Sequence, residues 1–478
     1  MRTYLIALLL VPLVFSGCGT VKPEAAFLEV QSTVVARSGQ NPEWIREPAS
    51  REDLPARLHA LLEAELTVET AQQIALFNNH TLQASFEEIG ISQADLVQAG
   101  LLRNPQISAS VRFPDRPPSV ANTEFGIGNN LLDLIITPLR RKIAAQQLEQ
   151  TKLRVTNEVL KLLAEVKRAF YTLQAREQLL VELRTMVAAN EAAAELAARQ
   201  HEAGTVNELG LISQQTLYSQ SKLDLAQAEI QRSLEREKLN RLLGLSGANT
   251  KWKVAPKLPE IPTEELSDAD LEAAALAQRL DLAIADKQVE LAERALSLKR
   301  KTRYLPTGVD LEFSAERDTS RQWVRGPQLS LALPIFDWGQ GQVPRLESEL
   351  RQAQRQREAL AVQVESEVRE TSAMLRAGQA AAQEYRTVLL PNRARIIDLY
   401  LRQYNFMLKG PFDLLNARQQ QAQAEHAYIE IVRDYWVARC ELERVVGGKL
   451  VGPASNAKPA SPPANPAQES EKVEPKKQ

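Results

Sequence analysis

The sequence of 478 residues is poor in aromatic side chains, which make up 5% of it, and contains only two cysteines. A compact enzyme core usually depends on large rings, so the low aromatic content argues against one large globular core. The formal net charge of -2 provides neither a basic field for nucleic acid nor an acidic tail. The composition therefore indicates no nucleic-acid partner and favours long helices that pack side by side.

Catalytic and metal-binding motifs are also missing. No HExxH, GxSxG or glycine-rich phosphate loop occurs in the sequence. No two of the four histidines have the i, i+4 spacing that would place them on one helical face as metal ligands; they are His59, His80, His201 and His426. We therefore expect neither an enzyme nor a site for a cofactor or metal ion.

Glycine and proline are absent between Pro138 and Gly204. Apolar residues in this stretch follow the alternating three and four spacing of a coiled coil. At 1.5 Å per residue such a helix is on the order of 90 Å long, which exceeds the width of a globular core. A returning helix should end near Gly244, and a second pair of long helices should follow Pro344 and turn near Gly410.

Two hairpins interrupt the helical pattern, one in each half of the chain. After Pro105 and again about 200 residues later, after Pro306, the hydrophobic period changes from that of a helix to two. Each strand has one apolar face and is about the length needed to cross a bilayer in a barrel. The order of helix, hairpin and long helix therefore occurs twice, as expected for a duplicated module.

The chain is accordingly expected to be mainly α, with two modules of long helices and a hairpin. Four strands cannot close a membrane barrel alone, because an open sheet would leave its edge amides unpaired in hydrocarbon. Closure would require further copies of the chain. The expected segments are a signal peptide (1–17), an N-terminal tether (18–66), a first repeat (67–247, hairpin about 106–131), a linker (248–267), a second repeat (268–448, hairpin about 308–336) and a disordered tail (449–478).

The N-terminus has the layout of an export signal, with Arg2 followed by an apolar run that is too short to span a membrane. The segment Phe15-Ser16-Gly17-Cys18 resembles the bacterial lipobox, with Phe15 where Leu is usual. That resemblance implies lipid attachment at Cys18, and Gly19 rather than Asp implies sorting to the outer membrane. The alternative is an ordinary signal peptide that is cut nearby. Cys440 is expected to be a small core residue without a disulfide partner.

Several motifs, in their order and duplication, resemble the TolC-like outer-membrane efflux proteins. They are the helix opening at Leu66-Thr67-Val68-Glu69, the strand entries Asn104-Pro105 and Leu305-Pro306, the strand exit Leu333-Pro334-Ile335-Phe336-Asp337-Trp338-Gly339, and the helix ends Leu242-Leu243-Gly244 and Val445-Val446-Gly447. The resemblance implies a homotrimer with a 12-stranded barrel in the outer membrane, four strands per chain, and a periplasmic α-barrel. It also implies a passive channel that works with a periplasmic adaptor and an inner-membrane pump.

Within this family the tunnel closes at the periplasmic tip of the helices. The resemblance implies turns at Gly204 and Gly410 and an acidic constriction around Asp413, with Asn416 at a second position that is often acidic. Asp413 could instead simply stabilise the first turn of its helix. Met407 occupies the place of Gly204 in the second half, so the two turns are expected to differ in geometry. The tip sequence Tyr404-Asn405-Phe406-Met407 is similar to a branch associated with heavy-metal resistance.

A rival interpretation is a lipid-anchored coiled-coil protein, or a periplasmic adaptor, whose hairpins pack on helices in water. Both interpretations predict an anchored helical protein. Only the channel predicts a trimer that requires detergent and conducts ions.

Overall fold

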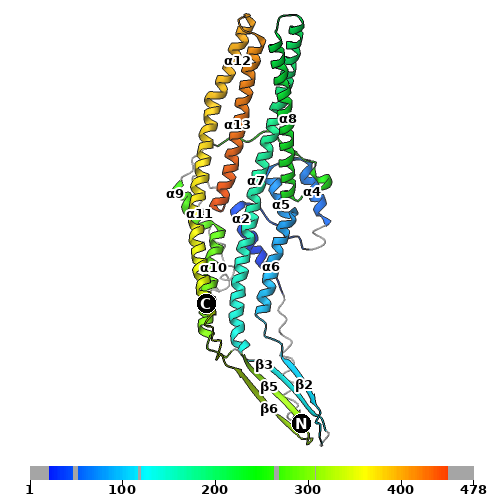
Figure 1. Ribbon diagram of the computed structural model, residues 1–478, viewed down its shortest axis with the longest axis vertical. Coiled ribbons are helices and arrows are strands. Elements are labelled where there is room, and N and C mark those ends of the chain that lie inside the picture. The colour runs from blue at the N-terminus through cyan, green and yellow to red at the C-terminus, as the bar shows by residue number, and fades with distance from the viewer. Residues whose placement is uncertain (1–20, 47–51, 117–119, 263–267, 307, 450–478) are drawn as a thin grey trace, which may run out of the picture.

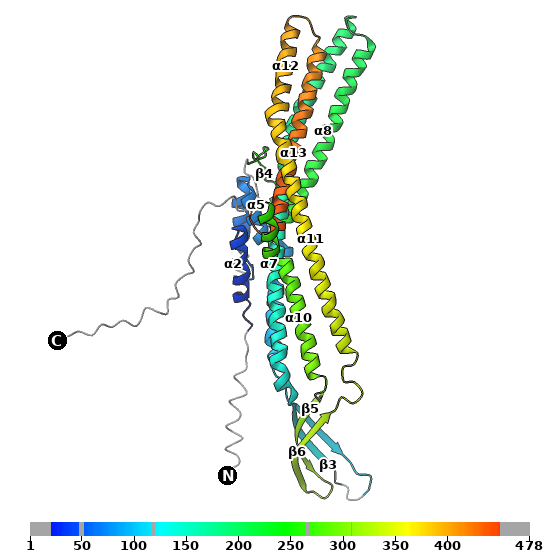
Figure 2. The ribbon, with the colours of Figure 1, turned by 90° about the vertical axis from the view of Figure 1, so that its left-hand side faces the viewer.

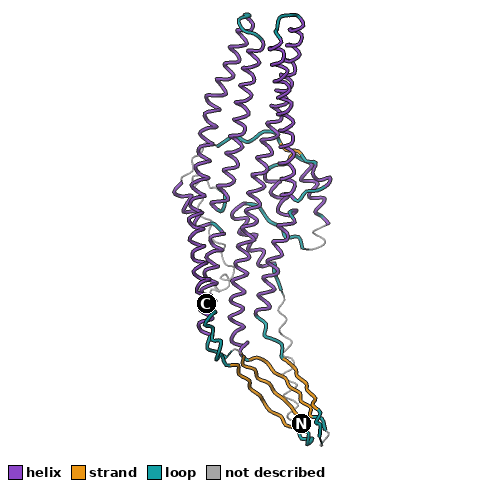
Figure 3. Tube along the Cα trace, in the orientation of Figure 1, coloured by secondary structure: helices purple, strands orange, loops and turns teal. Residues whose placement is uncertain are grey.

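The computed structural model describes residues 21–46, 52–116, 120–262, 268–306 and 308–449. The expected signal peptide, Cys18 and the tail from residue 450 lie outside the described residues. The molecule is long and narrow, with the strands at one end and two pairs of helices at the other (Figure 1). Figure 3 shows that helix makes up nearly all of the remaining length.

The first half of the chain contains two shorter helices, a hairpin and two long helices. They are α5 (Val68–Asn78), α6 (His80–Ala99), β2 (Gln106–Arg112), β3 (Asn122–Asn130), α7 (Leu132–Glu202) and α8 (Glu208–Leu243). The 71 residues of α7 make it the long rod that the missing glycine and proline predicted.

The second half repeats this order with one further interruption. Its elements are α9 (Asp268–Gln278), α10 (Leu280–Thr302), β5 (Gly308–Arg317), β6 (Trp323–Ala332), α11 (Gln342–Glu384), the π-helical segment η2 (Tyr385–Leu389), α12 (Leu390–Asn405) and α13 (Pro411–Val446). The interruption has a chemical cause, since Pro391 has no N–H to donate to Thr387 and its ring crowds that carbonyl. Helical spacing after Pro344 predicts one continuous helix, so the break between α11 and α12 corrects that prediction.

The N-terminal segment was expected to be a tether with at most short helices, but it packs onto the body of the molecule. Its helices are α2 (Glu24–Ser38) and α4 (Leu54–Glu63). On α2, Phe27, Val30 and Val34 are buried and join a core cluster with α6 and α7. The short strands β1 (Glu65–Leu66) and β4 (Lys253–Val254) pair in parallel, and the 3₁₀ turn η1 (Gly247–Thr250) lies between α8 and β4.

The core runs along the shared seams of the long helices. Val159, Val166, Leu173 and Leu180 of α7 are fully or almost fully buried, which confirms the coiled-coil spacing as the packing face. α7 packs against α6 and α8 on one side and against α10 and α13 on the other. Cys440 is buried and free, and burial raises the pKa of its thiol to about 12, as expected of an inert core residue.

Each half has a break in the helical segment that leads to its hairpin, where helical spacing predicts one continuous helix. The first break is at Asn79, whose side chain accepts the Leu82 N–H at 2.9 Å and donates to the Leu242 carbonyl at 2.9 Å. The second is at Arg279, whose ψ of 125° is extended. Thr67 begins α5 with a reciprocal hydrogen-bond pair to Thr70, as predicted. α7 begins at Leu132 rather than after Pro138, because the Asn130 side chain accepts the Leu132 N–H at 2.9 Å.

The break at Asn79 is matched to the end of α8. Asn78 donates from Nδ2 to the carbonyls of Leu243 and Gly244, both at 2.8 Å. Gly244 has φ +68°, and a Cβ built there would lie 2.3 Å from the Asn78 carbonyl oxygen. Asn78 and Leu243, which are 165 residues apart in the sequence, are therefore in direct contact.

Replacing Gly244 with alanine should destabilise the first half of the molecule more than replacing Gly247. Gly247 also has positive φ, +60°, but nothing lies within 4 Å of its added Cβ. Gly247→Ala should cost about 1 kcal/mol, from the backbone conformation alone. Gly244→Ala adds a steric overlap with rigid backbone and should cost about 3 kcal/mol or more. Chemical unfolding followed by circular dichroism would measure both, and equal losses would contradict the fitted contact.

Candidate functional site

The four strands form one antiparallel sheet in the order β2-β3-β5-β6. β3 and β5 are neighbours, so the two hairpins of the two halves join edge to edge. Within the described residues β2 and β6 pair on one side only. The described residues thus form one four-stranded sheet with two open edges.

One face of this sheet is apolar and exposed. Ile107 lies opposite Ile127, which lies opposite Phe313, and these side chains are 80%, 52% and 54% exposed. The same face carries Phe125 and, two residues from Phe313, Leu311. An apolar face of this extent needs a nonaqueous neighbour. The expected alternation of the strands is confirmed in β2, β3, β5 and β6.

The opposite face is polar and internally bonded. The Ser108 hydroxyl donates to Glu312 at 2.8 Å across the position of Gly126. A Cβ at Gly126 would lie 2.0 Å from the Glu312 carboxylate, so the glycine leaves the room for this contact. Asn130 donates to Asp310 at 2.9 Å on the same face. A sheet with one apolar face and one polar, acidic face is suited to separate lipid from water.

The opposite end of the molecule consists of two helical tips. At the first, Gly204 has φ +74° and the Thr205 N–H bonds the Gln200 carbonyl at 2.9 Å. At the second, Met407 has φ +58° and the Leu408 N–H bonds the Gln403 carbonyl at 2.9 Å. The two turns therefore share one geometry, and the expected difference was wrong. A left-handed methionine costs about 1–2 kcal/mol, which the turn hydrogen bonds offset.

Gly410 has φ -84° and precedes the first residue of α13, in the place that Asn207 has before α8. The Asp413 carboxylate accepts the Gly410 N–H at 3.1 Å, so this side chain caps the helix. Asn416 lies one turn further along α13. The second tip is also apolar, since Phe406, Met407 and Leu408 are largely exposed.

A buried ion-pair network fixes the middle of the molecule. Arg279, 6% exposed, makes two bonds to Asp281, at 2.6 and 3.0 Å, and one to Glu367 at 2.5 Å. Burial opposes ionisation of both carboxyls, but the bonds from Arg279 lower the pKa of each below its ordinary value. The network joins the break between α9 and α10 to α11.

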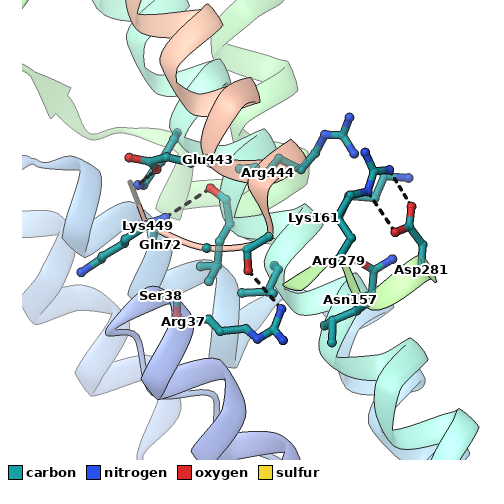
Figure 4. Close-up of a pocket in the computed structure, with 17 residues that line it drawn as sticks. Arg37, Ser38, Gln72, Asn157, Lys161, Arg279, Asp281, Glu443, Arg444 and Lys449 are labelled. Atoms are coloured by element: carbon teal, nitrogen blue, oxygen red, sulfur yellow. Dashed lines mark hydrogen bonds and ion pairs between the residues drawn. The ribbon is translucent and has the colours of Figure 1, made fainter. Parts of the chain in front are cut away.

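A cavity of about 90 Å³ lies beside this network (Figure 4). Arg37 of α2 donates to the carbonyls of Gln278 and Gly447, at 2.5 and 3.1 Å, and so caps the ends of α9 and α13. Lys167 pairs with Glu443 at 2.6 Å. Arg37 and Lys167 thus join α2 and α7 to the ends of α9 and α13, so the cavity lies at a junction of segments.

No group of three or more His, Cys, Asp or Glu side chains that could hold a metal ion occurs among the described residues. In the same part of the chain, every helix is too short or too polar to cross a membrane.

The chain resembles known proteins in sequence and in fold. No family model matches the chain. The cobalt-zinc-cadmium resistance protein CzcC of Cupriavidus metallidurans is 24% identical over 397 residues, which are 80% of this chain and 90% of CzcC.

Solved structures show the same fold. The CmeC outer membrane channel of Campylobacter jejuni superposes with a TM-score of 0.67 at 15% identity, over 86% of this chain and 89% of that chain. The outer-membrane channel OprN superposes with a TM-score of 0.65 at 16% identity, over 85% and 94%. The resemblance indicated by the sequence motifs is confirmed, and the chain has the fold of the TolC-like outer-membrane efflux proteins.

Proposed function

We propose that this protein is the outer-membrane channel of a tripartite efflux system, a passive conduit from the periplasm to the exterior. The observation that carries the proposal is the four-stranded sheet, exposed and apolar on one face, polar on the other and open at both edges. Three copies joined edge to edge would give a closed barrel of 12 strands, with every backbone group paired. The fold shared with CmeC and OprN supports the same arrangement.

The helices would continue the barrel as a periplasmic tunnel. Apolar side chains remain exposed on the outer surfaces of single chains, among them Leu223, Ile230 and Leu234 of α8. Packing against sister chains would cover such stripes. The apolar second tip, with Phe406, Met407 and Leu408, would then receive a periplasmic adaptor that links the channel to an inner-membrane pump. A lipid on Cys18 would hold the N-terminus at the membrane.

Native mass measurement after detergent extraction, with single-channel recording in planar bilayers, tests this proposal. We expect a trimer that conducts ions. A monomer without conductance would instead support the envelope coiled-coil protein, the rival interpretation.

We place the narrowest point of the tunnel at the second tip, with three copies of Asp413 as an acidic ring. Asp413→Asn should lower the ratio of cation to anion permeability severalfold, because it removes three like charges from the ring. The asparagine oxygen can still accept the Gly410 N–H, so the helix start should survive. Reversal potentials in a salt gradient would measure the ratio.

Asp398→Asn is the matched control, since this exposed carboxylate of α12 pairs with Arg402 at 2.9 Å. It should leave selectivity unchanged. If Asp413→Asn behaves as the control does, Asp413 is a helix cap only.

Heavy-metal cations are the cargo that the comparisons favour. The relative CzcC is named for cobalt, zinc and cadmium resistance. Deletion of the gene should then lower the tolerated concentration of these salts, and complementation should restore it. Unchanged metal tolerance together with new sensitivity to organic toxins would indicate another cargo.

A further inference from the structure

The junction between the sheet and the helices carries a concentration of cationic side chains that the channel function does not use. Five of them are here named the basic collar: Arg141 and Lys142 of α7, Lys299 and Lys301 of α10, and Arg303 just after it. The other nearby arginines have carboxylate partners. Asp133 pairs with both Arg103 and Arg140, and Glu347 pairs with Arg300.

The collar residues differ from these arginines in their contacts. Among the described residues, Arg141, Lys142, Lys299 and Lys301 make no ion pair. Arg303 lies over the rings of Tyr304 and Trp338, at 4.4 and 5.2 Å from their centroids. Arg141, Lys142 and Lys301 are exposed. Four positive charges therefore lie where α7 begins and α10 ends, and none of them forms an ion pair with a described residue.

The helix dipole explains only part of this pattern. Lys299 and Lys301 lie in the last turn of α10, where cations are favoured. Arg141 and Lys142 lie near the beginning of α7, where they gain nothing from the dipole. The dipole therefore does not account for both groups together.

The cations of α7 and those of α10 lie at nearly the same distance from the sheet along the long axis of the molecule. α7 and α10 run antiparallel, and Gln150 bonds Gln288 between them at 3.0 Å. Counting along both helices from this bond, Lys299 lies about level with Leu139, within one helical turn of Arg141. Figure 2 shows these ends of α7 and α10 directly above the strands.

An exposed apolar band separates the collar from the sheet. It consists of Leu134, Ile135, Tyr304 and Leu305, all exposed. The sheet itself begins where the Leu131 N–H bonds the Val309 carbonyl at 2.7 Å. From Ile135 to Arg141 the helix rises about 9 Å, close to the thickness of one headgroup layer plus the reach of a long side chain. Along the molecule, the apolar face of the sheet is followed by a band of aromatic and aliphatic side chains and then by cations. Proteins that span a membrane show the same sequence of side chains where they leave the lipid.

We propose that the basic collar binds the phosphate groups of anionic phospholipids in the periplasmic leaflet of the outer membrane. The proposal rests on the proposed function, since it requires that the sheet spans that membrane. Unpaired cations beside an apolar band attract anionic headgroups, and each is worth about fivefold in affinity for such a surface. The collar would thereby set the depth at which the barrel sits and order acidic lipids around it.

The test uses the full-length protein in mild detergent, with phosphatidylglycerol or phosphatidylcholine added and bound lipid counted by native mass spectrometry. The wild-type protein should retain phosphatidylglycerol preferentially. The triple variant Lys142→Gln, Lys299→Gln, Lys301→Gln should lose on the order of 100-fold in affinity for it. The charge-retaining variant with arginine at the same three positions should keep the preference.

The matched control replaces Lys251, Lys253 and Lys257 with glutamine, an equal change in charge at exposed positions around β4. It should bind as the wild-type protein does. Equal phosphatidylglycerol binding by the collar variant, or an equal loss in the control, would overturn the proposal. So would displacement of the lipid by millimolar inorganic phosphate, which would mark a site for free anions.

Conductance in neutral phosphatidylcholine bilayers separates this proposal from the channel function. The collar variant should conduct there as the wild-type protein does. A conducting protein without lipid preference would refute the collar and leave the channel intact, whereas a wild-type protein that does not conduct would refute the channel itself.

Discussion

Arg279→Ala should lower the free energy of unfolding by about 3 kcal/mol, because it removes the closest partner of two half-buried carboxylates and leaves Glu367 with Arg444 at 3.7 Å. Asp281 and Glu367 are both bonded to this guanidinium, which is 6% exposed. Chemical unfolding followed by circular dichroism would measure the loss. The matched control is Arg345→Ala, whose exposed pair with Glu349 at 2.8 Å should contribute less than about 1 kcal/mol.

The same variant should flatten the pH dependence of stability. In the native protein the pKa of Asp281 and of Glu367 is lowered, so their contribution is present above the ordinary carboxyl range and is lost as the pH falls through it. Without Arg279, burial still opposes ionisation of both carboxyls, and only the charge of Arg444, the Leu282 N–H at Asp281 and the Gln363 side chain at Glu367 remain to favour it. The variant should therefore lose less stability than the wild-type protein as the pH falls towards 4. A pH profile parallel to that of the wild-type protein would show that the network is not responsible.

Phe313→Lys should prevent assembly in the membrane, because Phe313 lies in the middle of the apolar face of the sheet. A lysine at the centre of the lipid face of a barrel costs about 2–4 kcal/mol, and three copies in a trimer multiply this cost to about 6–12 kcal/mol. The yield of detergent-resistant trimer, and of protein in the outer-membrane fraction, would measure the effect.

Ser314→Lys provides the control at the next residue of the same strand. Ser314 faces the polar side, opposite Gly126, so its replacement should assemble close to normally. Comparable assembly of both variants would mean that the apolar face does not contact lipid. Loss of both would point to a general defect of the strand.

Local patterning predicted much of this molecule. A stretch without glycine or proline gave a continuous α7, alternation gave the four strands with their faces, and Thr67 began its helix as expected. These features depend on residues close together in sequence, where backbone propensity and hydrophobic period act directly. The tip turns are also local, although the left-handed conformation of Met407 was missed because glycine is the usual residue there.

The helix breaks at Asn79 and Arg279 depended on partners more than 80 residues away. Asn79 donates to Leu242 and Arg279 binds Glu367, so neither break has a local signal that outweighs helical spacing. The neighbouring position of β3 and β5 and the docking of Arg37 on two helix ends are equally nonlocal. The amino-acid pattern decides which segments are rod or strand, because that choice is made within a few residues. Packing in three dimensions decides where rods bend and which edges meet, because those contacts exist only after distant segments have come together.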